Sequence, residues 1–166
     1  MTNETVQVAI IMGSDSDLPV VEASFSILDD FGVKYTKNVM SAHRTPHDVM
    51  ELIKTSEQNG FKVFIAAAGM AAHLAGAVAA HSTKPVIGIP IESGGMGGID
   101  SLLSTAMMPP GVPVATVAVG KSGAKNSAIL AVQILATSNE DLAQKLVEYK
   151  QNMRSEVLEK DKKLNS

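Results

Sequence analysis

Residues 6–19 read VQVAIIMGSDSDLP. The first seven residues form an almost continuous apolar run, which is typical of a β-strand covered on both faces. Gly13 then permits a tight turn, and Pro19 stands where the first turn of a helix would begin. A strand, a glycine turn and a helix in this order predict the opening unit of a parallel α/β sheet.

The rest of the chain repeats this alternation of strand and helix. Further apolar runs of strand length are Lys34–Val39, Val63–Ala68, Pro85–Ile89 and Val112–Val119. Helices are expected between them, at Leu18–Phe31, Pro46–Gly60, Ala71–His81 and Ala124–Ala136. In the first of these, Val20, Ala23, Ile27 and Phe31 are expected on the inner face, and Gly32 is expected to cap the helix. Since crossovers between parallel strands are right-handed, the pattern predicts a three-layer αβα sandwich with a flavodoxin-like parallel five-stranded sheet.

The C-terminal part has a different character. Leu142, Leu146, Tyr149, Met153 and Val157 form a helical stripe within a highly charged segment, and a helix is expected over 139–159. This helix could pack on its own domain or lie as an arm on a neighbouring subunit. We favour the arm, because the sheet already has its helices. The final residues, 160–166, are expected to be a frayed polar tail.

Composition limits the possible functions. The chain has 166 residues, a formal net charge of −3 and no cysteine. The length suits a single domain spanning 1–166, and the charge offers no electrostatic surface for nucleic acid. Without cysteine, disulfides, thiolate catalysis and thiolate metal sites are excluded. The opening residues MTNET do not resemble a signal peptide, and no apolar run reaches membrane-spanning length, so a cytoplasmic protein is expected.

The residues that follow each predicted strand are the natural place for a ligand site. In an open parallel sheet, ligands bind beyond the carboxyl ends of the strands. The segments that topology brings to this edge are 13–17 (GSDSD), 41–46 (SAHRTP), 69–73 (GMAAH) and 92–95 (ESGG). Their convergence is more informative than any one of them alone.

The first of these segments combines hydroxyls with carboxylates. Ser14 and Ser16, together with backbone amides at the start of a helix, can bind phosphate oxygens. A carboxylate beside a phosphate would repel it unless it faced another part of the ligand, and Asp17 could accept hydrogen bonds from a sugar diol. A sugar phosphate is therefore one interpretation. In the other, Asp17 is a helix cap and nothing more.

The second segment adds a proton carrier and a cation. His43 can titrate near neutral pH, and Arg44 can hold a phosphate through two hydrogen bonds. A single histidine in a loop is often an ordinary surface or core residue. A His-Arg pair at the carboxyl end of a strand, facing a Ser-Asp turn, favours a functional role instead.

Three motifs together resemble a known family. GSDSD at 13–17, SAHRTP at 41–46 and AGMAAHLAG at 68–76 closely resemble the bacterial N5-carboxyaminoimidazole ribonucleotide mutases of purine biosynthesis, also described as catalytic subunits of phosphoribosylaminoimidazole carboxylase. The likeness continues through PVIGIP at 85–90 and GIDSL at 98–102 and covers nearly the whole chain.

The resemblance implies roles for particular residues. His43 would be the single acid/base, and Arg44 would join Ser14, Ser16 and Asp17 in holding the ribose 5′-phosphate and the ribose. The substrate's carboxylate and imidazole would lie against Ser41, Ala42, Gly69, Met70 and Ala71. His73 would border the site, or else be a helix-packed or interface histidine. The resemblance also implies a homo-octamer and no metal or organic cofactor.

Some positions depart from the family pattern, and two other functions remain open. Met70 and Ala75 stand where glycine and proline are common, Glu92 stands for glutamine, and the segment 94–98 is unusually rich in glycine. One alternative is a direct carboxylase that uses free carbon dioxide, although that branch of the family has lysine in place of Arg44. The other alternative is a non-catalytic nucleotide-binding module of flavodoxin-like fold. A receiver module is disfavoured, because the third strand does not end in an aspartate.

Overall fold

The computed structural model describes residues 5–165, and these contain one five-stranded parallel sheet. The strands are β1 (Val8–Met12), β2 (Tyr35–Val39), β3 (Val63–Gly69), β4 (Val86–Ile91) and β5 (Ala115–Thr116). Their order is β2-β1-β3-β4-β5, and every neighbouring pair is parallel. The predicted flavodoxin-like sheet is confirmed.

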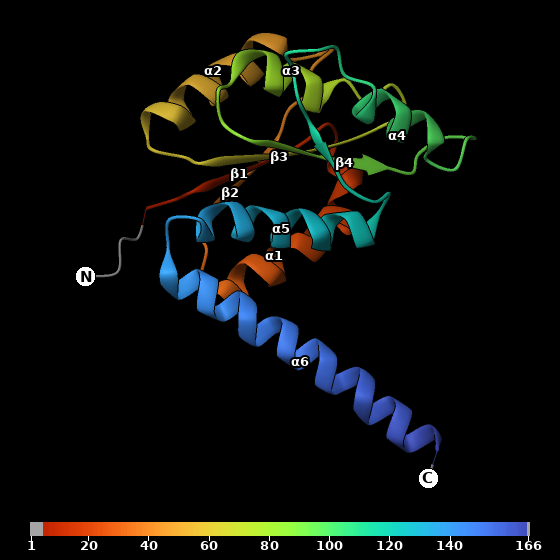
Figure 1. The fold of residues 1–166 in the computed structure, drawn as a ribbon. Helices are drawn as coiled ribbons and strands as arrows, with labels where there is room; N and C mark the ends of the chain where they lie inside the picture. The colour runs from red at the N-terminus through yellow and green to blue at the C-terminus, as the bar shows by residue number, and fades with distance from the viewer. Residues whose placement is uncertain (1–4, 166) are drawn as a thin grey trace.

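Helices cover both faces of this sheet. They are α1 (Leu18–Phe31), α2 (Pro46–Gln58), α3 (Leu74–His81), α4 (Ile99–Ala106), α5 (Lys121–Ala136) and α6 (Glu140–Leu164), with a short 3-10 helix, η1, at Asp15–Asp17. Helices α1 and α5 lie on one face, and α2, α3 and α4 lie on the other (Figure 1). The three-layer αβα sandwich is therefore as predicted. No helix among residues 5–165 is long and apolar enough to cross a membrane.

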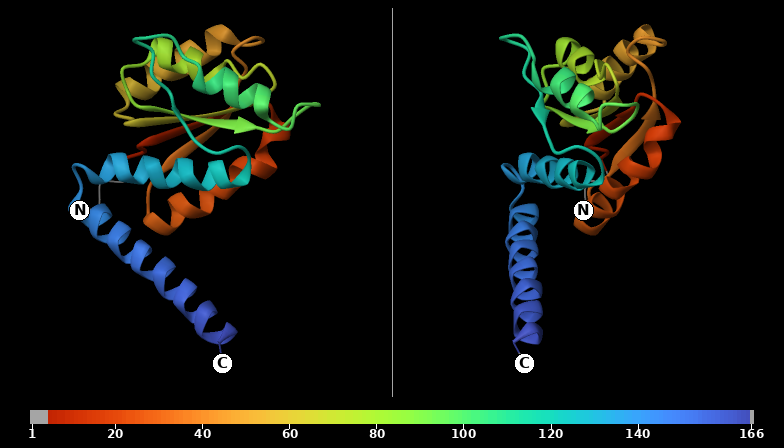
Figure 2. Two further views of the ribbon diagram at one scale, coloured as in Figure 1. Left: turned by 45° about the vertical axis from the view of Figure 1, so that its right-hand side comes forward. Right: turned by 90° about the vertical axis from the view of Figure 1, so that its right-hand side faces the viewer.

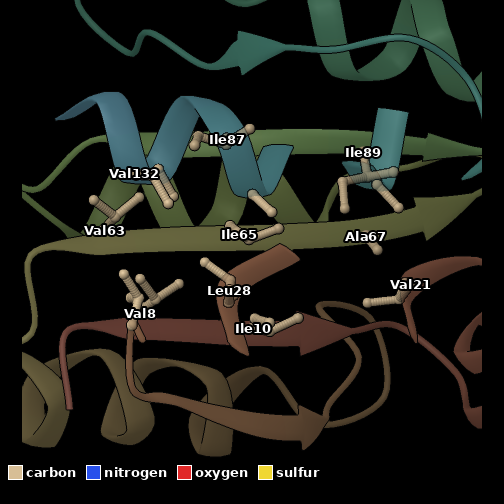
Figure 3. Close-up of a cluster of buried hydrophobic side chains, with 14 of the residues drawn as sticks. Val8, Ile10, Val21, Leu28, Val63, Ile65, Ala67, Ile87, Ile89 and Val132 are labelled. Atoms are coloured by element: carbon tan, nitrogen blue, oxygen red, sulfur yellow. The ribbon is translucent and has the colours of Figure 1, made fainter. Parts of the chain in front are cut away.

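The central strands divide their side chains between two cores. Along β1, Val8 and Ile10 face the core shared with α1 and α5, whereas Ala9 and Ile11 face the core on the opposite side. Successive side chains of a strand point to opposite faces, so a continuous apolar run serves both layers. Figure 3 shows Val8 and Ile10 together with Leu28 of α1 on the first of these faces.

Helix α1 begins and ends as expected, but its buried face is rotated slightly. Val21 and Leu28 are fully buried, whereas the predicted inner residues Val20, Ala23 and Ile27 are only half-buried at the margin of the core. The apolar stripe is wide enough that sequence alone could not locate its centre. Gly32 ends the helix at a φ of +72°, as predicted, and its N–H donates to carbonyls of the last turn.

Three elements near the end of the sheet differ from expectation. Strand β5 has two residues instead of the eight expected over 112–119. Pro113 lacks the backbone donor that a strand beginning at 112 would need there. Helix α3 begins at Leu74 instead of Ala71, because 71–73 form the turn that follows β3. Helix α4 was not predicted. It is short, and two of its large apolar side chains, Ile99 and Leu103, are exposed.

The first turns of α6 pack on the chain's own body, and the rest projects away from it (Figure 2). Leu142 is buried, and the Tyr149 ring lies 5.7 Å from that of Phe31 between centroids. From residue 150 onward every described residue of the helix is exposed. The predicted frayed tail from 160 is wrong, because the helix continues to Leu164 with two lysines in its last turn, where they complement the helix dipole.

Candidate functional site

A cavity of about 470 Å³ opens at the carboxyl ends of the strands. All of the predicted site residues line it: Ser14, Ser16, Asp17, Ser41, Ala42, His43, Arg44, Gly69, Met70, Ala71 and His73. The structure adds Gly13, Ala68, Leu74 and Ser93 to the lining. The edge of the sheet that topology selects is therefore the edge that carries this cavity.

The segment after β1 is held by a reciprocal set of hydrogen bonds. The Oγ atom of Ser14 accepts from the backbone N–H of Ser16 at 3.2 Å, and Oδ2 of Asp17 accepts from the N–H of Ser14 at 3.1 Å. This is a capping box that closes η1. Asp17 makes no side-chain hydrogen bond to the start of α1, so the interpretation of Asp17 as the cap of that helix is wrong.

Asp17 is a largely buried carboxyl group beside the cavity. Only 6% of its surface is exposed. Burial raises the pKa of this carboxyl because the charged form loses hydration, the N–H of Ser14 opposes the shift, and the nearby Asp15 adds to it. A buried carboxylate that lines a cavity is an acceptor for ligand hydroxyls.

The segment after β2 is a tight turn fixed by hydroxyl groups. Oγ1 of Thr45 accepts from the N–H of Ser41 at 2.9 Å, and Oγ of Ser41 accepts from the N–H of Arg44 at 3.2 Å. Pro46 then begins α2, where its missing N–H costs no helical hydrogen bond. This turn gives His43 and Arg44 a defined backbone position.

Arg44 links the first two segments. Its Nη2 atom donates to the carbonyl oxygen of Gly13 at 2.9 Å. The guanidinium therefore lies next to the turn that carries Ser14 and Ser16, and it has further N–H groups for an anion. Arg44 is the only lysine or arginine among the described residues that line the cavity.

His43 is in direct contact with His73 across the cavity. Nε2 of His43 lies 2.7 Å from Nδ1 of His73, and the rings meet edge to face with centroids 4.8 Å apart. One of these nitrogens carries a hydrogen and the other accepts it, so the tautomers of the two rings are complementary there. Of the two expectations for His73, the structure supports the one at the border of the site.

The segments after β3 and β4 meet at the far side of the lining. Gly69 leaves room for Ser93, because a Cβ at position 69 would collide with Oγ of Ser93. Met70 follows at a φ of +56°, a conformation in which glycine is favoured. Ser93 was not among the predicted site residues, although its segment was placed at this edge. Its contact with Gly69 could not be read from the sequence, because the two residues lie on different loops and only the fold brings them together.

The chemical groups that line the cavity suit a ligand with a phosphorylated sugar and an attached ring. They comprise a histidine pair, one cation, one buried carboxylate, several hydroxyls and apolar side chains that include Ala42, Ala68 and Leu74. No group of three or more histidine, aspartate or glutamate side chains that could hold a metal ion occurs within residues 5–165.

Comparisons with known proteins point to one family. The AIR carboxylase family model matches residues 7–156. The N5-carboxyaminoimidazole ribonucleotide mutase of Bacillus subtilis is 51% identical over 157 residues, which are 95% of this chain and 97% of the relative. The enzyme of the same name from Escherichia coli is 45% identical over 157 residues, with 95% and 93% covered. Among solved structures, Treponema denticola PurE superposes with a TM-score of 0.88 at 30% identity, covering 96% of this chain and 99% of that one.

Proposed function

The chain belongs to the AIR carboxylase family, and from that membership we propose that it acts as an N5-carboxyaminoimidazole ribonucleotide mutase in purine biosynthesis. The reaction moves a carboxylate from the exocyclic nitrogen of an aminoimidazole ribonucleotide to the ring carbon C4. The observation that carries the proposal is the convergence of every predicted site residue on one cavity.

The substrate's phosphate is assigned to the side of the cavity where Arg44 meets the first segment. The hydrogen bond from Arg44 to Gly13 supports this assignment, because it holds the guanidinium beside the hydroxyls of Ser14 and Ser16. A guanidinium and hydroxyl donors suit a phosphate well. Asp17 is assigned to the ribose hydroxyls, since a carboxylate accepts from both groups of a diol.

His43 is assigned as the single acid and base. In the first half-reaction the C–N bond breaks, its electron pair stays on nitrogen, and His43 protonates that nitrogen as carbon dioxide leaves. In the second, C4 attacks the carbon dioxide and His43 removes the proton from C4, which restores the aromatic ring. His43 gives up one proton in the first half-reaction and takes one back in the second, so a single histidine can serve both. The neighbouring His73 can hold the His43 ring in place through their shared hydrogen bond.

Orientation supplies much of the expected rate. Carbon dioxide released beside C4 reacts as part of the same complex, so the enzyme avoids a second encounter from solution. The backbone around Gly69 and Ala71 and the apolar side chain of Ala42 would hold the imidazole and its carboxylate.

The proposal is tested by supplying the purified chain with the N-carboxylated ribonucleotide in buffer depleted of bicarbonate. We expect conversion to the C4-carboxylated product without any cofactor or nucleotide triphosphate. A direct carboxylase, the runner-up, would instead need the uncarboxylated ribonucleotide and free carbon dioxide. Tight binding without any turnover would favour the non-catalytic module.

We also propose that the chain works as a homo-octamer. Two surfaces support assembly. One comprises the exposed apolar side chains of Ile99 and Leu103 on α4 and of Met107 directly after it. The other is the projecting half of α6. Apolar surface of this kind on a described helix is typical of subunit contacts. The cytoplasmic location and the absence of nucleic-acid partners stay predictions.

A further inference from the structure

Met70 holds a backbone conformation that its residue type rarely adopts. Its φ is +56°, and within residues 5–165 it is the only residue other than glycine with a positive φ. In the left-handed region the Cβ atom of an L-residue crowds the carbonyl that follows, so a side chain there costs stability. A glycine would avoid that cost. An outlier that persists beside a cavity is a reason to ask what its side chain does.

The Met70 side chain spans two loops at the rim of the cavity. The residue lines the cavity, yet 61% of its surface is exposed. Its Cγ atom lies 4.0 Å from the point where a Cβ at Gly94 would stand, on the loop after β4. One residue earlier on each loop, Gly69 and Ser93 are already in close contact. Met70 therefore extends the junction of the two loops outward to the rim.

Methionine suits this position for both steric and chemical reasons. Branching at Cβ is strongly disfavoured at positive φ, which excludes valine and isoleucine. Methionine is unbranched at Cβ, flexible and apolar, so it can cover an irregular opening without offering water a hydrogen bond. Gly94 and Gly95 carry no side chains, so the cover on this part of the rim comes from Met70.

We propose that Met70 seals the cavity during carboxylate transfer and thereby sets the share of turnovers in which carbon dioxide is recaptured. This inference rests on the proposed mutase reaction. Carbon dioxide is small and uncharged, so Arg44 cannot hold it as it holds a phosphate, and its retention depends on closure of the cavity. When it escapes, water converts it to bicarbonate and a proton. The ribonucleotide is then left uncarboxylated, with its nitrogen protonated by His43.

The test uses Met70→Gly and Met70→Asn, since both glycine and asparagine accept a positive φ while removing the apolar cover. Substrate labelled in its carboxylate carbon is converted by each variant in a large excess of unlabelled bicarbonate. The readouts are the label retained in the product and the uncarboxylated ribonucleotide released per turnover. We expect the parent to retain its label and both variants to retain at least about threefold less, with a melting temperature no lower than the parent's.

Two further variants separate sealing from a structural role. Met70→Leu keeps an apolar side chain unbranched at Cβ and should recover most of the retention. Met96→Ala is the matched control, because Met96 is the same residue type and equally exposed at 61%, but does not line the cavity. It should retain label as the parent does.

The outcomes distinguish the sealing role from the reaction itself. If the parent, Met70→Gly and Met70→Asn all retain label equally, the sealing role is overturned and the mutase activity stands. If the parent fails to convert the labelled substrate, or if its product loses the label to the unlabelled bulk bicarbonate, the mutase activity is overturned. Should one of the two variants fail to fold, the other decides.

Discussion

Asp17 keeps its carboxyl group largely buried, with the N–H of Ser14 as a donor 3.1 Å from Oδ2. Burial raises its pKa above the ordinary 3.8, so the folded protein binds this proton more tightly than the unfolded chain does. The free energy of unfolding then falls as pH rises from 3.8 through the folded-state pKa, and Asp17 opposes folding at pH 7. A group that opposes folding is expected to be kept for function.

We therefore expect Asp17→Asn to raise the melting temperature at pH 7, because the amide oxygen can still accept from Ser14 without the cost of a buried charge. Below pH 3.8 the difference from the parent should disappear. Affinity for the ribonucleotide should fall, since the diol loses a charged acceptor. Differential scanning calorimetry at both pH values and titration calorimetry at pH 7 measure these effects. Asp30→Asn, at an exposed position, should leave both the melting temperature at pH 7 and the affinity unchanged.

His43 is the second residue for which the proposed mechanism predicts a specific effect of substitution. His43→Asn keeps a side chain of similar size and some hydrogen bonding but removes proton transfer, so turnover should fall by at least about a hundredfold while substrate affinity stays near the parent value. Steady-state kinetics and equilibrium binding separate the two quantities. His47→Asn, at an exposed position on α2 outside the cavity lining, should change neither. Normal turnover by His43→Asn would contradict the single-histidine mechanism.

At the scale of elements, the close approach of α3 and α4 to β4 depends on a glycine. A Cβ at Gly88 would collide with Cγ2 of Thr105 in α4 and would lie 3.2 Å from Cβ of Ala75 in α3. Thr105 is buried, and its hydroxyl donates to Ser101, so it has little freedom to move away. Ala75 is the small residue through which α3 takes part in this contact.

Gly88→Ala should therefore lower the free energy of unfolding by about 1–3 kcal/mol, the usual cost of overpacking a dense core. Denaturant titration measures the change. Gly95→Ala is the matched control, because nothing lies within 4 Å of a Cβ at that position. An equal stability of the two variants would show that the contact between β4 and its helices is looser than the structure indicates.

At the scale of the whole molecule, α6 joins two different environments. Its first turns bury Leu142 and bring Lys145 Nζ within 3.0 Å of the carbonyl oxygen of Phe31, so they belong to the chain's own fold. Beyond residue 150 the helix meets solvent on all sides, with Val157 63% exposed. An isolated projecting helix with apolar side chains gains stability when a partner covers it.

Truncation after Lys150 should thus reduce the oligomer mass while leaving the protomer folded, because it removes only the projecting half. Truncation after Ala136 should also lower the melting temperature, since it strips Leu142 and Tyr149 from the core. Light scattering and circular dichroism distinguish the two effects. A stable monomer for the intact chain would contradict the proposed assembly.

Much of the fold could be predicted because its signals are local. Continuous apolar runs, glycine stops such as Gly32 and the proline start of α2 each report on a few neighbouring residues. The four segments around the cavity followed from the same signals and one topological rule, that the carboxyl ends of parallel strands share an edge, and the family resemblance selected residues within them. Helix α4 and the length of β5 could not be predicted, since α4 is short with an exposed apolar face and β5 is a two-residue edge strand within a longer apolar run.

The sequence by itself predicted the flavodoxin-like sheet, the three layers and the segments that meet at the cavity. Only the tertiary structure decided which of those residues touch. His43 and His73 are in contact although they are 30 positions apart, and Arg44 donates to Gly13 across 31 positions. The contact of Gly69 with Ser93 and the strained Met70 above it likewise arise where separate loops meet. Local sequence patterns specify where strands and helices begin and end. Contacts between side chains of separate loops depend instead on how the helices and strands that carry those loops pack, to within a fraction of an ångström.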